Sequence, residues 1–291
     1  MAGLISLLRT TWLCAALVLP TVATAVPLWE IEGTDNRILL LGSIHFLRAE
    51  DHPLPREIIK AYQEADIIVM ELAMDSINPA DIQRVQQELA IDPHGRNLSK
   101  IIGAGDYRQA RSLASTIDID LDLMLPYEPW FAALQITQLQ LLKHGFDGSF
   151  GIEKIIAGKA AEDGKPLLGL ETLSEQLHAL DTLPDKAQKF FLLQTLQDAQ
   201  SVNDDLNTMV KAWKQGNIKK LDQLLLEGMR GQPEVYDQLL VQRNRRWSGT
   251  IIDMMNDSQD YLIIVGALHL IGEDSVQNML KEQGIRTRRV H

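Results

Sequence analysis

The chain has 291 residues and a formal net charge of −11, with 39 acidic and 28 basic side chains. This acidic balance, without a basic stripe, argues against nucleic acid or an anionic bilayer as a partner. The one cysteine, Cys14, lies in a leader-like N-terminal segment, so disulfides and thiol catalysis are excluded for the chain that follows this segment.

Residues 1–25 predict a secretory signal peptide that is removed after export. Arg9 precedes an apolar stretch, and the letters ATA that end the segment form a small-x-small cleavage signal. Pro20 interrupts the stretch, which is too short for a confident membrane span, and no later run reaches that length. We therefore expect a periplasmic or secreted protein without stable membrane insertion after cleavage.

The first part of the mature chain alternates between predicted strands and helices. "LWEIEGTDNRILLLGS" predicts a hairpin with strands at Trp29–Glu32 and Arg37–Leu41, joined by Gly-Thr-Asp-Asn. "PLPREIIKAYQEA" carries apolar residues at helical spacing, with prolines near its start, and predicts a helix. "DIIVMEL" predicts a short buried strand that ends at Glu71, and residues 78–150 are expected to be mostly helical.

The second part of the chain continues this alternation. "IEKIIAGKAAEDG" predicts a helix that ends at Gly164, and "KPLLGLET" predicts a strand that carries Glu171. Residues 183–245 are expected to be helical. "YLIIVGALH" then predicts a buried strand, "DSVQNMLKEQG" a helix, and "IRTRRV" a closing edge strand.

This order of elements predicts an α/β fold with a mostly parallel central sheet and flanking helices. Uninterrupted apolar runs such as ILLL, IIVM and LIIV favour central strands that are covered on both faces. The helical stretches 78–150 and 183–245 are too long for simple crossovers, so we expect a helical cap inserted between strands. Residues 26–291 are thus expected to form a single domain.

Four chemical groups follow the four predicted buried strands. LLLGSI runs into His45, IIVM into Glu71, PLLGL into Glu171, and LIIVGAL into His269. In parallel α/β sheets, ligands bind beyond the carboxyl ends of the strands, so these groups are expected to converge. Two imidazoles with carboxylates suit a divalent metal ion with open positions for water. The repeated Gly-x-x-His pattern is thus interpreted as two halves of one site.

Structural roles remain open for the two glutamates. Glu71 could cap the following helix or pair with an arginine, and Glu171 or Thr172 could simply begin a helix. Arg243, which is followed by Asn244, could lie in solvent or point inward to bind a substrate carboxylate or an oxyanion.

Other polar and aromatic residues are weaker candidates. His52 lies in a loop after the first Gly-x-x-His and could reach the same cleft, although a polar loop role is the simpler interpretation. Tyr127 and Trp130 could line a pocket, but aromatic residues at a helix start more often belong to the core. The remaining histidines are expected at the surface: His94, His178 and His291, while His144 would sit in the last turn of a helix.

With these residues in view, the sequence resembles the TraB/GumN family. That family belongs to a superfamily that includes the Tiki proteases and is related to haem-binding ChaN-like and erythromycin-esterase-like proteins. The resemblance covers nearly the whole mature chain. It is carried by "LWEIEG", "GSIHFL", "IIVMEL", "PW" at 129–130, "GKPLLGLET", "RN" at 243–244 and "YLIIVGALHLIGEDSVQNMLKEQG".

The resemblance implies an α/β fold with a site built from both Gly-x-x-His motifs and nearby glutamates, and in the Tiki branch a metal-dependent peptidase activity. Carried over by position, it marks His45, Glu71 and His269 first, followed by Glu171 and Arg243. One departure is "FGIEKII", where Glu153 stands in place of the Asp expected in a G-[VIL]-D pattern, which puts any role of Glu153 in doubt.

We therefore expect an exported metal-dependent hydrolase that cleaves a peptide bond in a peptide or small-molecule substrate. The expected ion is Mn, Co or Zn, and the expected metal ligands are His45, His269, Glu71 and Glu171. One of the two glutamates would take a proton from water, and Arg243 would steady the oxyanion. Two alternatives remain: a metal-free hydrolase with His45 as general base oriented by Glu71, and a non-enzymatic protein that binds haem or a peptide.

Overall fold

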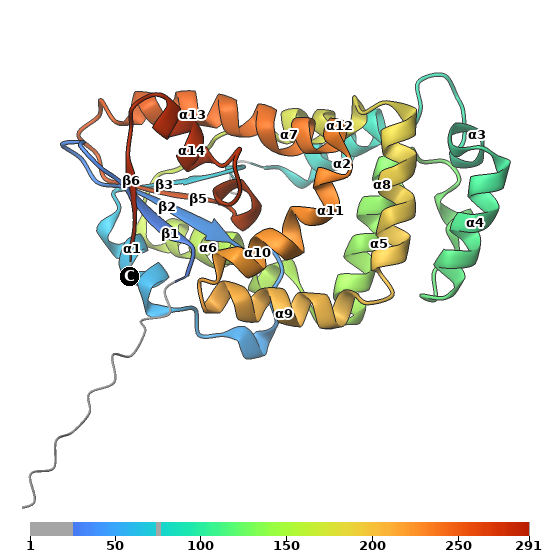
Figure 1. The fold of residues 1–291 in the computed structure, drawn as a ribbon, viewed down its shortest axis with the longest axis horizontal. Helices are drawn as coiled ribbons and strands as arrows, with labels where there is room; N and C mark the ends of the chain where they lie inside the picture. The colour runs from blue at the N-terminus through green and yellow to red at the C-terminus, as the bar shows by residue number, and fades with distance from the viewer. Residues whose placement is uncertain (1–25, 74–76, 291) are drawn as a thin grey trace, which may run out of the picture.

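The computed structural model of the chain describes residues 26–73 and 77–290 (Figure 1). The predicted signal peptide, residues 1–25, and His291 lie outside the described residues. The strands are β1 (Leu28–Ile31), β2 (Ile38–Ser43), β3 (Ile67–Met70), β4 (Leu167–Gly169), β5 (Tyr261–Gly266) and β6 (Thr287–Arg289). The α-helices before β4 are α1 (Arg56–Glu64), α2 (Pro79–Leu89), α3 (Leu98–Ile102), α4 (Ala104–Ser115), α5 (Pro129–Lys143) and α6 (Ile152–Asp163).

The remaining helices follow β4, and short turns of other helix types connect several elements. The α-helices are α7 (Leu173–Asp181), α8 (Asp185–Asp198), α9 (Val202–Lys214), α10 (Ile218–Leu225), α11 (Glu227–Arg230), α12 (Pro233–Tyr236), α13 (Gln242–Met254) and α14 (Val276–Glu282). The 3₁₀ turns are η1 (Ala49–Asp51), η2 (Leu121–Met124), η3 (Gly148–Phe150) and η5 (Ala267–Leu270), and η4 (Asp237–Val241) is a π-helical turn.

The strands form a six-stranded sheet in the order β4-β3-β5-β2-β1-β6. Strands β4, β3, β5 and β2 are parallel neighbours, while β1 runs antiparallel to both β2 and β6. The α/β prediction with a mostly parallel sheet is therefore confirmed. The predicted hairpin is the β1–β2 pair, and the predicted closing strand is β6 at the edge of the sheet.

Burial explains why the central strands read as uninterrupted apolar runs. Every residue of β2 and β5 is buried, because helices cover both faces of the sheet. Alternate residues face opposite ways. Leu39 and Leu41 share a core with α1 and α6, whereas Ile38 and Leu40 share another with α13 and α14. Figure 1 shows α13 and α14 on one side of the sheet and α1 and α6 on the other.

The helical cap lies beyond the carboxyl ends of the parallel strands. Helices α2 to α5 are inserted between β3 and β4, and helices α7 to α12 between β4 and β5, while α6 and α13 complete these connections and pack on the sheet. Helices α3, α4, α5 and α8 enclose a core of their own, separate from the cores against the sheet. In Figure 1, α3 and α4 are the part of the cap farthest from the sheet. The strand ends therefore open into the space between sheet and cap.

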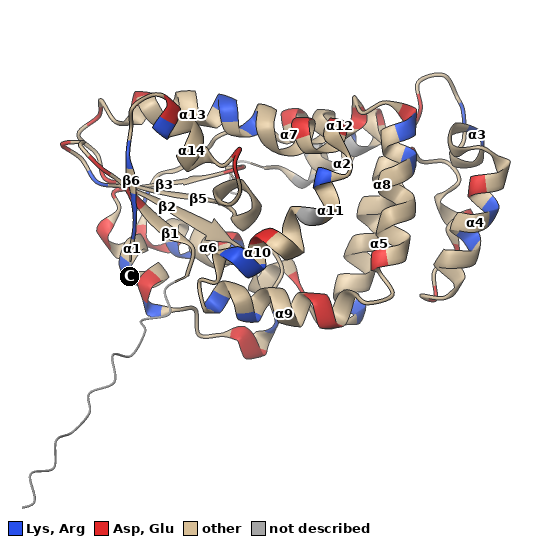
Figure 2. Ribbon diagram, viewed as in Figure 1, with Lys and Arg blue, Asp and Glu red and all other residues tan. Residues whose placement is uncertain are grey.

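Two further properties concern the surface. Within residues 26–73 and 77–290, no helix is long and apolar enough to cross a bilayer. Figure 2 shows acidic and basic residues interspersed along the helices rather than separated into regions of one sign.

Candidate functional site

The parallel strands bring three of the predicted groups together at one point. His45 follows β2, Glu71 follows β3 directly, and His269 lies in η5 after β5. Because β3, β5 and β2 are consecutive parallel neighbours, their carboxyl ends share one edge of the sheet. The Nε2 atoms of His45 and His269 each lie 3.9 Å from Oε1 of Glu71. The two Gly-x-x-His motifs thus face the same carboxylate oxygen.

Glu71 is held in this position from both of its oxygens. Oε1 accepts a hydrogen bond from the backbone N–H of Gly266 at 2.7 Å. Oε2 accepts hydrogen bonds from Arg243 at 2.6 Å and from Gln176 at 3.2 Å. Burial opposes ionisation of this carboxyl, but His269, His45, Arg243 and the Gly266 N–H outweigh it and lower the pKa of Glu71 to about 2. Glu71 is therefore an ionised carboxylate across the physiological range.

Glu171 follows β4 and is also buried, but its contacts differ from those of Glu71. The N-cap of α7 is Thr172, which forms a capping box with Glu175, so Glu171 does not cap this helix. Both oxygens of Glu171 accept hydrogen bonds from Arg243, at 2.6 to 3.2 Å. Its other described partners are Arg246 and Gln176. Glu171 thus lies beside the guanidinium, and among the described residues it forms no hydrogen bond or ion pair with either imidazole.

Arg243 connects these two carboxylates. It lies in the first turn of α13 and is buried, with Nε and the two terminal nitrogens donating to Glu71 and Glu171, to the carbonyl of Leu239, and to Nε2 of His269. Its guanidinium also lies 4.7 Å from the ring centre of Trp247. Burial disfavours its charge, but the two carboxylates outweigh burial and raise the pKa of Arg243. Its N–H groups are therefore occupied by the protein itself.

The tautomer of His269 follows from its neighbours. The amide nitrogen of Asn244 donates to the carbonyl of Asp274 at 2.7 Å, which directs Oδ1 of Asn244 toward Nδ1 of His269, 2.6 Å away. Nδ1 of His269 must therefore carry the proton, and Nε2 is left as an acceptor. Burial, together with the charge of Arg243, lowers the pKa of His269 to about 3. His269 is thus a neutral imidazole whose Nε2 accepts a hydrogen bond from Arg243 at 3.2 Å and lies 3.9 Å from Oε1 of Glu71.

His45 is oriented in the same way by another residue. Its Nδ1 lies 2.9 Å from Oε1 of Glu153, in the first turn of α6, and Ser43 donates to the same oxygen. The charge of Glu153, opposed by desolvation, raises the pKa of His45 to about 9. The side chain of His45 is 52% exposed, whereas that of His269 is 4% exposed. His45 is therefore the member of the pair that meets solvent.

Glu153 is the principal residue that the sequence left in doubt. A Cβ atom on the preceding Gly151 would lie 2.0 Å from the carbonyl oxygen of His45, so only glycine permits this approach of α6 to the loop after β2. The pairing of Gly151 with the next-but-one acidic residue was the available signal in the sequence. Ser43 and Gln176 also belong to the site and were not predicted, since a single serine or glutamine has no distinctive spacing.

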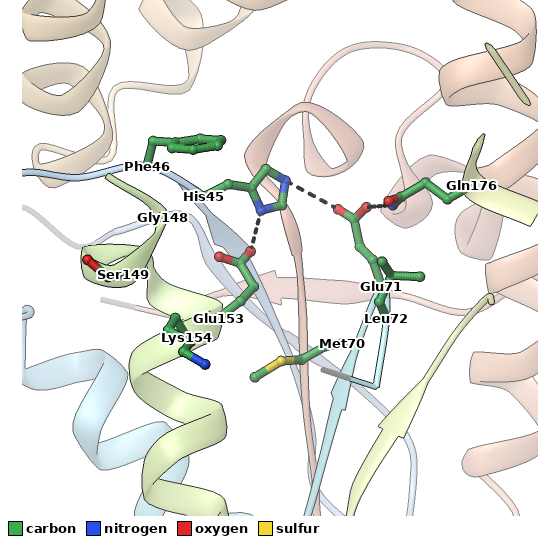
Figure 3. Close-up of a pocket in the computed structure, with 10 residues that line it drawn as sticks. All are labelled: His45, Phe46, Met70, Glu71, Leu72, Gly148, Ser149, Glu153, Lys154 and Gln176. Atoms are coloured by element: carbon green, nitrogen blue, oxygen red, sulfur yellow. Dashed lines mark hydrogen bonds and ion pairs between the residues drawn. The ribbon is translucent and has the colours of Figure 1, made fainter. Parts of the chain in front are cut away.

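A cleft of about 530 Å³ lies beside His45 and Glu71 (Figure 3). Volumes of this order are typical of small-ligand sites. Figure 3 shows His45 between Glu153 and Glu71, with Gln176 on the far side of Glu71. The residues that line the cleft are His45, Phe46, Met70, Glu71, Leu72, Gly148, Ser149, Glu153, Lys154 and Gln176.

The weaker candidates lie elsewhere. Nε2 of His52 lies 2.9 Å from the carbonyl oxygen of Phe150, and His52 is not among the residues that line the cleft. Trp130 is completely buried within the cap, and Tyr127 packs on its neighbour Phe131. His94 and His178 are exposed.

Two imidazoles and a carboxylate are donor types that a divalent metal ion takes. Two ligands of a tetrahedral ion, each about 2.1 Å from it, stand roughly 3.4 Å apart, and the observed separations of 3.9 Å are somewhat wider. A Cβ atom on Gly266 would lie 3.2 Å from both Oε1 of Glu71 and Nε2 of His45, so the glycine leaves open the space between these donors. Within the part of the chain that the structure describes, no group of three or more His, Cys, Asp or Glu side chains is arranged so that it could hold a metal ion.

Comparison with known proteins identifies the family. The sequence model of the TraB/PrgY/gumN family matches residues 27–289. The chain is similar to the protein YbaP of Escherichia coli (strain K12) and to YbaP of Shigella flexneri, in each case with 26% identity over 242 residues, which cover 83% of this chain and 87% of the relative. No solved structure matches the sequence. Because the family match spans nearly all of the described residues, the chain belongs to the TraB/PrgY/gumN family.

Proposed function

We propose that this protein is an exported metal-dependent hydrolase that cleaves peptide bonds, with its site at His45, Glu71 and His269. The observation that carries the proposal is the matched orientation of the two imidazoles. Each has its Nδ1 fixed by another side chain, Glu153 for His45 and Asn244 for His269, and each directs Nε2 to the same oxygen of Glu71. Histidines that bind metals are held in this way by partners of the second ring nitrogen.

The side chains around the site have distinct tasks in this proposal. His269 and Glu71 are already in the protonation states that metal binding requires, neutral and ionised respectively, because their pKa values are about 3 and about 2. A metal ion on Nε2 of His269 would replace the hydrogen bond that this atom accepts from Arg243. His45 must lose a proton, since its pKa is about 9. A divalent ion held there would polarise a substrate carbonyl and lower the pKa of a water molecule.

The structure changes the roles that we assign to Arg243 and Glu171 within this proposal. Every nitrogen of Arg243 donates to the protein, so binding an oxyanion would require one of these hydrogen bonds to break. The side chain of Glu171 is 1% exposed and bound to Arg243. We therefore assign both residues to holding Glu71 in place. Of the two glutamates, Glu71 is the one that lines the cleft.

A second candidate, a metal-free hydrolase, is supported by the contact of 2.9 Å between His45 and Glu153. Here Glu153, rather than Glu71, would orient His45, whose Nε2 is directed toward the cleft. With its pKa at about 9, His45 carries a proton at neutral pH and would act as the acid that protonates the leaving amine, while the ionised Glu71 in the same cleft would take the proton of the attacking water.

Metal analysis together with peptide hydrolysis tests the proposal. The purified protein is stripped with a chelator, reloaded with Mn, Co or Zn, and assayed for metal content and for cleavage of a peptide mixture by mass spectrometry. We expect the wild type to retain metal and to cleave peptides only when it is loaded. The His45→Ala/His269→Ala variant should do neither, and the His94→Ala/His178→Ala variant, which changes two exposed histidines, should match the wild type.

Equal metal content in the wild type and in His45→Ala/His269→Ala would contradict the ligand assignment. Cleavage that survives complete chelation and is lost in Glu153→Gln would favour the metal-free candidate. Metal binding without cleavage of any peptide would contradict the peptidase activity while leaving the metal site in place.

A further inference from the structure

The cleft beside the proposed site contains a cation that the metal chemistry does not use. Lys154, in the first turn of α6, lines the cleft and is exposed, and among the described residues no ion pair involving it is present. Its position on the helix explains this. Residues three and four positions away are the ones that can pair with a helical lysine, and here they are Phe150, Gly151, Ala157 and Gly158, none of which is charged.

Ser149, in η3, also lines the cleft. Its backbone N–H donates to Asp147, while no hydrogen bond of its hydroxyl is present among the described residues. Figure 3 shows Lys154 on the same side of the cleft as Glu153, and Glu71 and Gln176 on the opposite side. Lys154 thus lies on the wall formed by α6 and η3, and the carboxylate of Glu71 lies across from it, whereas the hydroxyl of Ser149 points away from both.

The surface between these polar groups is apolar. Phe46, Met70 and Leu72 line the same cleft, and Met70 lies in Figure 3 between the wall of Lys154 and the strand that carries Glu71. A ligand that fills the cleft would therefore place an apolar portion against these side chains and an anionic group near Lys154. A free cation beside an apolar surface favours an amphipathic anion over a neutral or cationic ligand.

We propose that Lys154 is a specificity-determining residue that binds a carboxylate of the substrate. The proposal rests on the proposed function, since it names the substrate class for the same site: short peptides with an apolar residue and a carboxylate near the bond that is cleaved. The carboxylate is either the C-terminal group of the peptide or an acidic side chain. Both groups are carboxylates, so Lys154 could bind either one, and peptides that carry only one of the two distinguish them.

Equilibrium binding, measured by titration calorimetry on the metal-loaded protein, tests the proposal without requiring cleavage. The first pair of probes is acetyl-Phe-Leu with a free C-terminal carboxylate and the same peptide with a C-terminal amide. The second pair is acetyl-Glu-Leu-amide and acetyl-Gln-Leu-amide, which differ only in the side-chain charge. The variants are Lys154→Met, Lys154→Glu and, as a control on the same helix, Lys159→Met, because Lys159 lies over the ring of Tyr62, whose hydroxyl bonds Asp163 on this helix.

We expect the wild type to bind one anionic probe more tightly than its neutral partner, by about fivefold for a partly exposed charge pair. Lys154→Met should remove this preference without weakening the neutral probe, Lys154→Glu should reverse it, and Lys159→Met should keep it. The pair that shows the preference identifies the source of the carboxylate.

Three results would overturn the proposal: equal binding of acid and amide in both pairs, an unchanged preference in Lys154→Met, or no binding of any probe by the wild type. The proposed function is judged separately by metal content and cleavage. If the wild type cleaves acid and amide peptides equally well and Lys154→Met changes neither, the specificity proposal fails while the hydrolase proposal stands.

Discussion

The two histidines of the site show how burial and a neighbouring charge decide the protonation state of an imidazole. His269 and His45 occupy matching positions after parallel strands, yet their pKa values are about 3 and about 9. His269 is buried against Trp247 and faces the neutral amide of Asn244. His45 is half-exposed and faces the carboxylate of Glu153, whose charge stabilises the imidazolium. Burial in the case of His269, and the charge of Glu153 in the case of His45, separate the pKa values of the two residues.

This difference predicts how metal binding depends on pH. Between pH 6.5 and about 9, His45 is protonated in the free protein, while His269 is already neutral and Glu71 already ionised. Metal binding must therefore release one proton from His45, so the apparent affinity should rise about tenfold per pH unit in this range. Loss of the carboxylate in Glu153→Gln should return the pKa of His45 toward about 6.5, and the affinity should then level off near neutral pH.

Titration of Mn or Co into the protein at several pH values checks this expectation. Glu162→Gln, which changes an exposed glutamate on the same helix, serves as the control and should keep the slope of the wild type. An affinity that does not change between pH 6.5 and 9 in the wild type would contradict the assignment of His45 as a ligand.

At the scale of elements, the site depends on how closely three connections approach one another. The turn from β5 into η5 passes through Gly266, whose φ of −50° is available to any residue. A glycine is therefore needed at this position because there is little room for a side chain, and not because of its backbone conformation. A side chain there would enter the gap that His45 and Glu71 share. The π-helical turn η4, just before α13, also helps to position a side chain of the site. It contains Leu239, whose carbonyl accepts a hydrogen bond from Arg243.

Gly266→Ala should accordingly weaken metal binding while leaving the fold intact. A methyl group at this position would lie 3.2 Å from Oε1 of Glu71 and from Nε2 of His45, which is closer than ordinary contact. Displacement of either donor should cost roughly 10- to 100-fold in affinity, as loss of supporting contacts does in other metal sites.

Metal titration and thermal unfolding together check the Gly266→Ala variant. The control is Gly249→Ala, within α13, where an added Cβ meets no other atom within 4 Å and should slightly stabilise the helix. If Gly266→Ala binds metal as tightly as the wild type and unfolds at the same temperature, the space over this glycine is not part of the site.

For the molecule as a whole, the buried charges connect the sheet to the cap. Arg243 on α13 contacts Glu71 after β3 and Glu171 before α7, so one guanidinium joins two strand ends to the helical segment that returns to β5. All three side chains are at most 9% exposed. A buried cation with two carboxylates is stable only as a complete set, since each group alone would be an uncompensated charge.

Removal of the cation should therefore destabilise the whole fold. We expect Arg243→Leu to lower the free energy of unfolding by about 3–5 kcal/mol, because Glu71 and Glu171 would remain buried without their partner. The double variant Arg243→Leu/Glu171→Gln should recover part of this loss. Urea denaturation checks both, with Arg111→Leu as the control, because Arg111 belongs to an exposed ion pair with Asp122 and its removal should hardly change the midpoint. A loss in Arg243→Leu no larger than in the control would contradict this role.

The residues that follow the buried strands could be predicted as site residues from the sequence, but the side chains that bind to them could not. The placement of His45, Glu71 and His269 at one edge follows from strand type alone, because parallel strands expose their carboxyl ends on the same side. The contacts of Glu171 depend on where α13 lies, and this helix begins about 70 residues later in the chain. The pattern of apolar residues in this helix does not decide whether its Arg243 is exposed to solvent or buried. Glu153 and Gln176 lie on helices whose rotation only packing fixes.

The sequence by itself determined the class of the fold and which polar group follows each buried strand. It also identified the three groups that meet at the strand ends, His45, Glu71 and His269. Local patterns suffice for these features because apolar runs, glycine stops and helix caps act over a few residues. The tertiary structure decided the protonation of each imidazole, the pairing of Arg243 with two carboxylates, and the cation in the cleft. These depend on burial and on charges brought together from distant segments, and electrostatic free energies change with distance and solvent exposure in ways that no local pattern records.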